Sequence, residues 1–87
     1  MVLRSRGAEA YGYPTEKGFL VKKGSRLSPD VTEKFKNSVK YPNRLYLETE
    51  HIVEDDIFVK DYTFFSAAHA ASVISGMAGR IDMWKEE

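Results

Sequence analysis

The sequence predicts a small α+β domain in which two β-hairpins and a short C-terminal strand pack with two or three short helices, in the order ββ-α-ββ-α-β. Alternating apolar and polar residues flank turn-forming segments, a Ser-Pro-Asp sequence marks a helix start, and an alanine-rich stretch lies between a serine and a glycine. The length of 87 residues fits one domain. We expect this domain to span residues 8–87, after a flexible N-terminal end at residues 1–7.

The first hairpin is predicted close to the N-terminus. Residues 8–13 alternate small or aromatic side chains with polar ones, as a strand with one buried face does. The Pro-Thr-Glu-Lys-Gly sequence of residues 14–18 is typical of a turn. Residues 19–23 are predicted to form the second strand, and the Gly-Ser pair at residues 24–25 ends the hairpin.

Two helical segments are expected next. The Ser-Pro-Asp sequence at residues 28–30 indicates a helix N-terminus, because serine and aspartate cap free N–H groups and proline suits the first turn. Apolar residues at helical spacing continue this helix to residue 39. Pro42 interrupts it, because the residue before a proline avoids helical backbone angles, and a second helix is expected over residues 43–51.

The second hairpin is predicted over residues 52–60, around an acidic turn at residues 54–56, and residues 61–65 extend or follow it. Neighbouring side chains of a strand point to opposite faces, so Phe64 and Phe65 cannot both face inward. One of them lies on a second buried face, or it is an exposed stacking or contact residue.

The alanine-rich helix is expected over residues 67–75, because Ser66 is a good N-cap and Gly76 suits the position after the last turn. Residues 80–84 alternate in polarity and predict a short last strand. Trp84 is predicted to be a core anchor against this helix, since small alanine side chains leave room for a large ring.

Composition narrows the classes of function. The chain has no cysteine, which excludes a disulfide framework, a thiol nucleophile and a thiolate zinc site. No apolar run approaches the ~20 residues that span a bilayer, and no apolar segment follows the first basic residues. The sequence therefore predicts a cytoplasmic protein with no membrane partner and no signal peptide.

The formal net charge is zero, but the charges are unevenly distributed. Residues 1–26 carry a surplus of four positive charges, and residues 48–61 carry an excess of five negative charges. Each segment is either ordinary solvated surface or, for the N-terminal one, a basic face that meets phosphate. The neutral total argues against tight, non-specific nucleic-acid binding by the domain alone.

No arrangement of residues predicts catalysis. His51 and His69 lie in different elements without a metal-ligand spacing, and His69 is interpreted as a structural histidine. The carboxylates at residues 54–56 could bind a hard cation, but adjacent carboxylates in a turn are more often solvated. The sequence lacks phosphate-loop, nucleophile-elbow and metalloprotease motifs. We therefore assign no catalytic residue, metal or cofactor and expect that the protein is not an enzyme.

Two segments resemble a known family. Residues 18–25, Gly-Phe-Leu-Val-Lys-Lys-Gly-Ser, are similar to the pattern G-F-x-V-x-x-G-S, and residues 58–66 are similar to F-x-x-D-Y-x-F-x-S. The chain resembles the bacterial domain-of-unknown-function family 4357, which is often found C-terminal to GIY-YIG nuclease domains. It is also similar to the restriction-enzyme adenine-methylase associated domain. The resemblance implies an accessory role in recognising nucleic acid. The chain departs from the family pattern at Ala67, His69 and Ala78.

The leading functional hypothesis is a non-catalytic accessory module that binds nucleic acid or is associated with nuclease or DNA-modification systems. Basic side chains would contact phosphate and serines would donate hydrogen bonds. The residues assigned to this contact are Lys22, Lys23, Ser25, Arg26, Ser66 and Arg80. The alternative is a protein-protein interaction module or a homodimer, because hairpin edges and an exposed phenylalanine permit pairing.

Overall fold

The computed structural model describes residues 1–86. Within them no helix is long and apolar enough to cross a membrane. In chain order the elements are β1 (Val2–Ser5), β2 (Ala8–Thr15), β3 (Gly18–Val21), α1 (Glu33–Lys36), α2 (Tyr41–Thr49), β4 (Val53–Glu54), β5 (Ile57–Phe58), β6 (Tyr62–Phe64), α3 (Ala67–Ser75) and the 3-10 helix η1 (Ile81–Met83).

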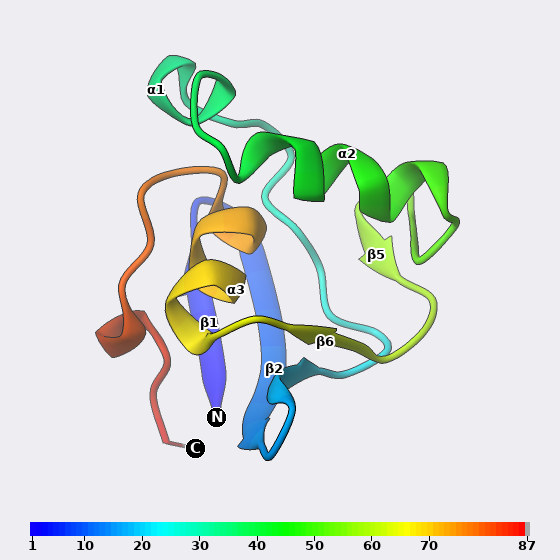
Figure 1. The fold of residues 1–87 in the computed structure, drawn as a ribbon, viewed down its shortest axis with the longest axis vertical. Coiled ribbons are helices and arrows are strands. Elements are labelled where there is room, and N and C mark those ends of the chain that lie inside the picture. The colour runs from blue at the N-terminus through cyan, green and yellow to red at the C-terminus, as the bar shows by residue number, and fades with distance from the viewer. Residues whose placement is uncertain (87) are drawn as a thin grey trace.

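Four strands form one antiparallel sheet in the order β1-β2-β3-β6, and β4 and β5 form a separate hairpin. Helix α3 lies across one face of the sheet, and α2 runs above both α3 and the β4–β5 hairpin and contacts each of them (Figure 1). The prediction of an α+β fold built on two hairpins and short helices is confirmed.

The core lies between α3 and the sheet face that it covers. Side chains of β2 and β3 alternate between the two faces, so Ala10, Phe19 and Val21 point into the core. The small side chains of Ala70 and Ala71, both fully buried, let α3 approach the sheet closely. Phe64 on β6 completes this layer, and Phe65 is 85% exposed, which decides between the alternatives for the phenylalanine pair.

Helix α3 has the bounds that its flanking residues predict. The Ser66 hydroxyl oxygen accepts a hydrogen bond from the His69 backbone N–H, which satisfies one free donor of the first turn. Gly76 ends the helix with a φ of 71°, a backbone conformation that glycine adopts without steric cost. Local chemistry at its two ends therefore sets the length of this helix.

Trp84 is the core anchor that the sequence predicts. Its side chain is 4% exposed, its indole Nε1–H donates to the Ala67 carbonyl at 2.9 Å, and its ring centroid lies 4.6 Å from that of Phe19. The indole thus packs between the first turn of α3 and the inner face of β3, with its polar N–H satisfied.

The N-terminal residues differ from expectation. Residues 1–7, predicted to be a flexible end, contain strand β1, in which Leu3 is fully buried. The two-residue turn of Arg6 and Gly7, with φ of 51° and 87°, folds β1 back on β2. The arginines in this segment face outward or pair with polar groups, so they did not prevent a short strand from forming.

The first helix is also shorter than predicted. Helix α1 begins after Thr32, whose hydroxyl accepts from the Phe35 backbone N–H, and it has only one turn. Ser28, expected near the N-cap, is instead fully buried, and its hydroxyl donates to the Asp30 carbonyl at 2.7 Å. A buried arginine needs this serine, as described below, and that long-range contact overrides the local helix signal.

The C-terminal strand expected at residues 80–84 is wrong. Residues 81–83 form the 3-10 helix η1, and Lys85 alone pairs with Val2 on β1. Trp84 follows this turn of helix and points into the core. In the acidic turn of the β4–β5 hairpin, Asp55 and Asp56 have φ of 52° and 64°, typical of a tight two-residue hairpin turn.

Arg44 is a buried cation that joins three segments of the chain. Its guanidinium donates to the Val73 carbonyl at 2.8 Å, to the Ser28 hydroxyl at 3.1 Å and to the Ser28 carbonyl. Val73 lies in the last turn of α3, where free carbonyls carry partial negative charge. Burial lowers the pKa of Arg44, but an arginine stays protonated in proteins, so its charge is held by carbonyl dipoles.

Replacing Trp84 with alanine should lower the free energy of unfolding by about 3–5 kcal/mol, because it leaves a cavity between α3 and β3. Small domains are often only ~5 kcal/mol stable, so the variant should be largely unfolded by circular dichroism. Trp84→Phe, which keeps a ring beside Phe19 but loses the hydrogen bond to Ala67, should lose clearly less. An alanine variant with the wild-type unfolding midpoint would contradict the anchor role.

Candidate functional site

The sheet face opposite α3 carries the candidate site. Strand alternation places the outward side chains of β1, β2, β3 and β6 on this face, and the helices cover the other side. Most of these side chains are exposed, and the others are partly buried. We call this surface the open face; its outward residues are Arg4, Glu9, Tyr11, Tyr13, Leu20, Lys22 and Thr63.

Two tyrosines form the centre of the open face. Tyr11 and Tyr13 are two residues apart on β2, so their side chains start ~6.8 Å apart on the same side of the strand. Tyr11 is 37% exposed and Tyr13 is 46% exposed. The register places Leu20 opposite Tyr13, and the Lys22 backbone N–H donates to the Tyr11 carbonyl at 2.8 Å. The face thus presents two aromatic rings with an ammonium group on the adjacent strand.

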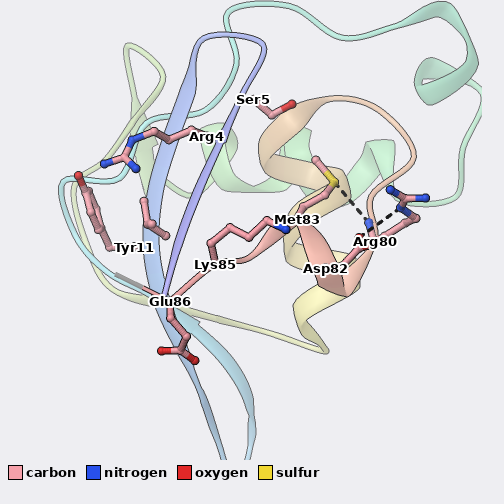
Figure 2. Close-up of a pocket in the computed structure, with 9 residues that line it drawn as sticks. Arg4, Ser5, Tyr11, Arg80, Asp82, Met83, Lys85 and Glu86 are labelled. Atoms are coloured by element: carbon pink, nitrogen blue, oxygen red, sulfur yellow. Dashed lines mark hydrogen bonds and ion pairs between the residues drawn. The ribbon is translucent and has the colours of Figure 1, made fainter.

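A groove of about 830 Å³ runs from Tyr11 along the outer edge of β1, where Lys85 pairs with Val2. In Figure 2, Arg4 and Tyr11 lie on its left, Arg80 and Met83 lie on its right, and Lys85 extends between them. A second, smaller hollow adjoins it on the other side of Tyr11. The groove is lined by Val2, Arg4, Ser5, Tyr11, Arg80, Asp82, Met83, Lys85 and Glu86.

Ion pairs partly neutralise the cations of the open face. Arg4 Nε lies 2.9 Å from Glu9 Oε2, and this hydrogen bond lowers the pKa of Glu9 and raises that of Arg4. Lys22 Nζ lies 3.7 Å from Asp61 Oδ2. Both pairs are exposed, and exposed pairs contribute little free energy, so an incoming phosphate can compete with these carboxylates.

The structure distributes the six predicted contact residues unequally. Lys22 lies on the open face and Arg80 lines the groove, while Lys23 is exposed beside Lys22 with its backbone N–H donating to Asp61 at 2.8 Å. Arg26 is exposed and borders the open face at Glu9: its backbone pairs with that of Glu9, its Nη2 lies 3.9 Å from Glu9 Oε1, and its Nε donates to the Gly7 carbonyl at 3.2 Å.

The two serines of the predicted set have structural roles. Ser25 is fully buried, and its hydroxyl oxygen accepts from the Tyr11 backbone N–H at 3.0 Å, so it offers no surface to a ligand. The Ser66 hydroxyl is occupied as the N-cap of α3. Ser25, which follows β3, holds the backbone of β2 at Tyr11 through its hydroxyl. We therefore correct its assignment from a ligand contact to a structural residue.

Sequence reasoning missed the tyrosines and two cations of this surface, Arg4 and Lys85. The alternation of Tyr11 and Tyr13 with small residues did predict a strand with one buried face. Their importance depends on which face α3 covers, and that is a long-range property of the fold. Arg4 was assigned to a flexible end, and Lys85 reaches the groove only because the chain returns to pair with β1.

A separate polar cluster joins α2, α3 and β6. His69 Nε2 lies 2.8 Å from Asn43 Oδ1, and Asn43 Nδ2 donates to the Tyr62 hydroxyl at 3.5 Å. The His69 ring also packs near Phe64. Burial, together with the charge of Lys40, lowers the pKa of His69. These contacts support the interpretation of His69 as a structural residue, and residues 1–86 contain no cluster of three or more side chains suited to a metal.

The comparison with known families covers the entire sequence. Residues 1–87 match DUF4357, described as a domain of unknown function. The chain belongs to the DUF4357 family. Neither the curated proteins nor the solved structures contain a significant match.

The residues of the two segments that resemble the DUF4357 family have structural roles. A side chain at Gly18 would place its Cβ 2.1 Å from the Phe64 carbonyl oxygen, so only glycine allows β3 and β6 to pair here. Asp61 accepts from the Lys23 backbone N–H, and Phe19, Val21 and Phe64 lie in the core. The family pattern therefore identifies residues that determine the backbone, and the open face lies largely outside it.

The depressed pKa of His69 predicts a pH dependence of stability. An unfolded histidine titrates near ~6.5, so just below that pH the unfolded chain binds more protons than the folded one. The stability associated with neutral His69 is present above about pH 6.5 and is lost as the pH falls through the folded pKa. Urea unfolding should therefore show a larger loss between about pH 7.5 and about pH 5.5 in the wild type than in His69→Gln.

His51, which is exposed, provides the matched control for this measurement. His51→Gln should keep the wild-type pH dependence. Equal slopes in the wild type and His69→Gln would show that His69 does not contribute.

Proposed function

We propose that this DUF4357 domain is a non-catalytic accessory module that binds single-stranded nucleic acid on the open face. The observation that carries the proposal is the pair of exposed tyrosines on β2, with Lys22 directly after β3 on one side and Arg4 on β1 on the other side. The resemblance to domains found beside nucleases supports the same class of ligand.

An unpaired strand fits this surface better than a duplex does. Bases of a single strand can separate and stack on aromatic rings, and each such contact contributes about 1–3 kcal/mol. The ~6.8 Å between the two tyrosine positions matches an extended strand whose bases are unstacked. In a duplex the base faces are covered by their neighbours and only edges are available in the grooves. Tyr11 and Tyr13 would then have no stacking partner.

Cations around the tyrosines would contact the phosphates. Lys22 lies beside Tyr11, and Arg4, Arg80 and Lys85 line the adjoining groove. Each phosphate contact on a single strand makes affinity fall with salt, with a slope of about −0.7 per contact. Because Glu9 and Asp61 pair with two of these cations, we expect modest affinity and only a few phosphate contacts.

The tyrosine pair is tested by fluorescence anisotropy with a labelled single-stranded oligonucleotide at low salt. Tyr13→Ala should weaken binding by about fivefold or more, which is the loss of one stacked base at ~1 kcal/mol, and Tyr11→Ala should act in the same direction. Tyr46→Ala is the matched control, because Tyr46 is 48% exposed, on α2 away from the sheet. It should bind as the wild type does.

Charge reversal adds a second arm to that experiment. Lys22→Glu should weaken binding and reduce its salt dependence, and Lys36→Glu on α1 should not. No binding at tens of micromolar protein, equal losses in Tyr13→Ala and Tyr46→Ala, or a preference for duplex DNA would each overturn the proposal.

A second candidate function is protein-protein interaction through the outer face of α2. Val39, just before the helix, is 92% exposed, and the consecutive residues Leu45 and Tyr46 on α2 are 46% and 48% exposed. Large apolar side chains exposed on one surface are typical of a contact face.

For the homodimer version of this candidate, light scattering should show a concentration-dependent increase in mass that Leu45→Glu with Tyr46→Glu abolishes. A strict monomer at high concentration would remove that version.

A further inference from the structure

A hollow of about 370 Å³ lies on the helical side of the molecule, between α1, the segment before α2, and α3. Its volume is at the low end of the range for small-molecule sites, ~300–1,000 Å³. The polar residues that line it are Lys34, Asn37, Ser38, Lys40 and Ser72. No described residue with a carboxylate lines it. The hollow therefore combines two ammonium groups with hydroxyl and amide groups.

Lys40 occupies a position that stability alone does not favour. It is the N-cap residue of α2, it makes no capping hydrogen bond, and the first turn of α2 contains no acidic residue. The N-terminus of a helix carries partial positive charge, which repels a nearby cation and attracts an anion. Glu33, on α1, is ion-paired with Lys36 at 3.5 Å and does not line the hollow. Positive potential is therefore concentrated here without a carboxylate to offset it.

Ser72 provides an independent indication of a ligand. Its side chain is 1% exposed, and its hydroxyl oxygen accepts from the Gly79 backbone N–H at 2.7 Å and from Lys40 Nζ at 3.4 Å. A hydroxyl also has a proton to donate. Among the hydrogen bonds of residues 1–86, none has the Ser72 hydroxyl as its donor. The hydroxyl oxygen is already satisfied by these two donors, and its proton is available to an acceptor bound in the hollow.

We infer that this hollow binds the phosphate group of a small molecule. A phosphate offers several strong acceptor oxygens, which match the two lysines and the free Ser72 proton. The hydroxyl of Ser38, which accepts from the Lys40 backbone N–H at 3.1 Å, has its own proton available as well. Phe35 and Ala78 form an apolar wall that an organic group attached to the phosphate can contact. This site is separate from the open face and does not depend on the proposed function.

The test is a titration of the full chain, followed by backbone amide NMR, with inorganic phosphate in a chloride buffer of constant ionic strength. We expect saturable shifts of the amides of Asn37, Ser38, Ser72 and Gly79, and unchanged signals on the open face. Lys40→Gln should weaken phosphate binding at least tenfold, since it removes a charged donor. Lys36→Gln is the matched control on the same segment, and it should bind phosphate as the wild type does.

A second variant separates binding from folding. Ser72→Ala removes the hydroxyl with little change in volume, and circular dichroism checks that it stays folded. A folded Ser72→Ala variant with weaker phosphate binding supports the inference. Shifts that do not saturate, or equal affinities for phosphate in the wild type and Lys40→Gln, overturn it.

Two further titrations distinguish the source of the phosphate. A nucleoside 5′-monophosphate that binds more tightly than inorganic phosphate, and loses part of this advantage in a Phe35→Leu variant that circular dichroism shows to be folded, supports a small organic phosphate. If only a single-stranded oligonucleotide shifts these amides, the hollow belongs to a nucleic-acid surface and the inference of a small-molecule site is wrong.

Discussion

The burial of Arg44 is the constraint on which the helical half of the domain depends. A guanidinium is costly to remove from water unless its N–H groups find acceptors, and here carbonyl oxygens and a serine hydroxyl accept from both terminal nitrogens in place of a carboxylate. Its planar fork reaches two segments at once, which a lysine ammonium could not do with the same geometry. The position of α2 is thereby tied to the last turn of α3 and to the loop at Ser28. One consequence is that the start of α2, with Lys40, lies against Ser72.

The parts of this fold that could be predicted are those whose causes are local. Helix α3 has the predicted bounds because Ser66 and Gly76 act within one turn of its ends. The hairpins follow from alternation and turn residues. Helix α1 and the last segment could not be predicted, because Ser28 is recruited by a residue 16 positions away and Trp84 turns inward to meet Phe19. Strand β1 was missed because only four residues form it and because it is stabilised mainly by pairing with β2.

The same distinction applies to the candidate sites. Lys22 and Arg80 were identified from charge alone, and they do border the surface that the fold leaves uncovered. The tyrosines were visible in the sequence, but their orientation relative to α3 was not. The hollow near Ser72 is formed by three segments far apart in the chain, and no local pattern marks it. The residues of the two segments that carry the resemblance mainly determine the backbone, and the candidate surfaces lie largely outside them. Ala78 lies in the wall of that hollow.

The pairing of Val2 with Lys85 has a mechanical consequence. Their backbone N–H groups each donate to the other residue's carbonyl at 2.8 Å, and the first strand and the segment that follows η1 lie side by side there (Figure 1). Because the two segments are antiparallel, tension applied between the ends would load these hydrogen bonds one after another, as in opening a zipper. A shearing load, in contrast, would be shared among many bonds. The contact is therefore the first to open under force, and its opening would uncover the edge of β1 while leaving α3 on the sheet.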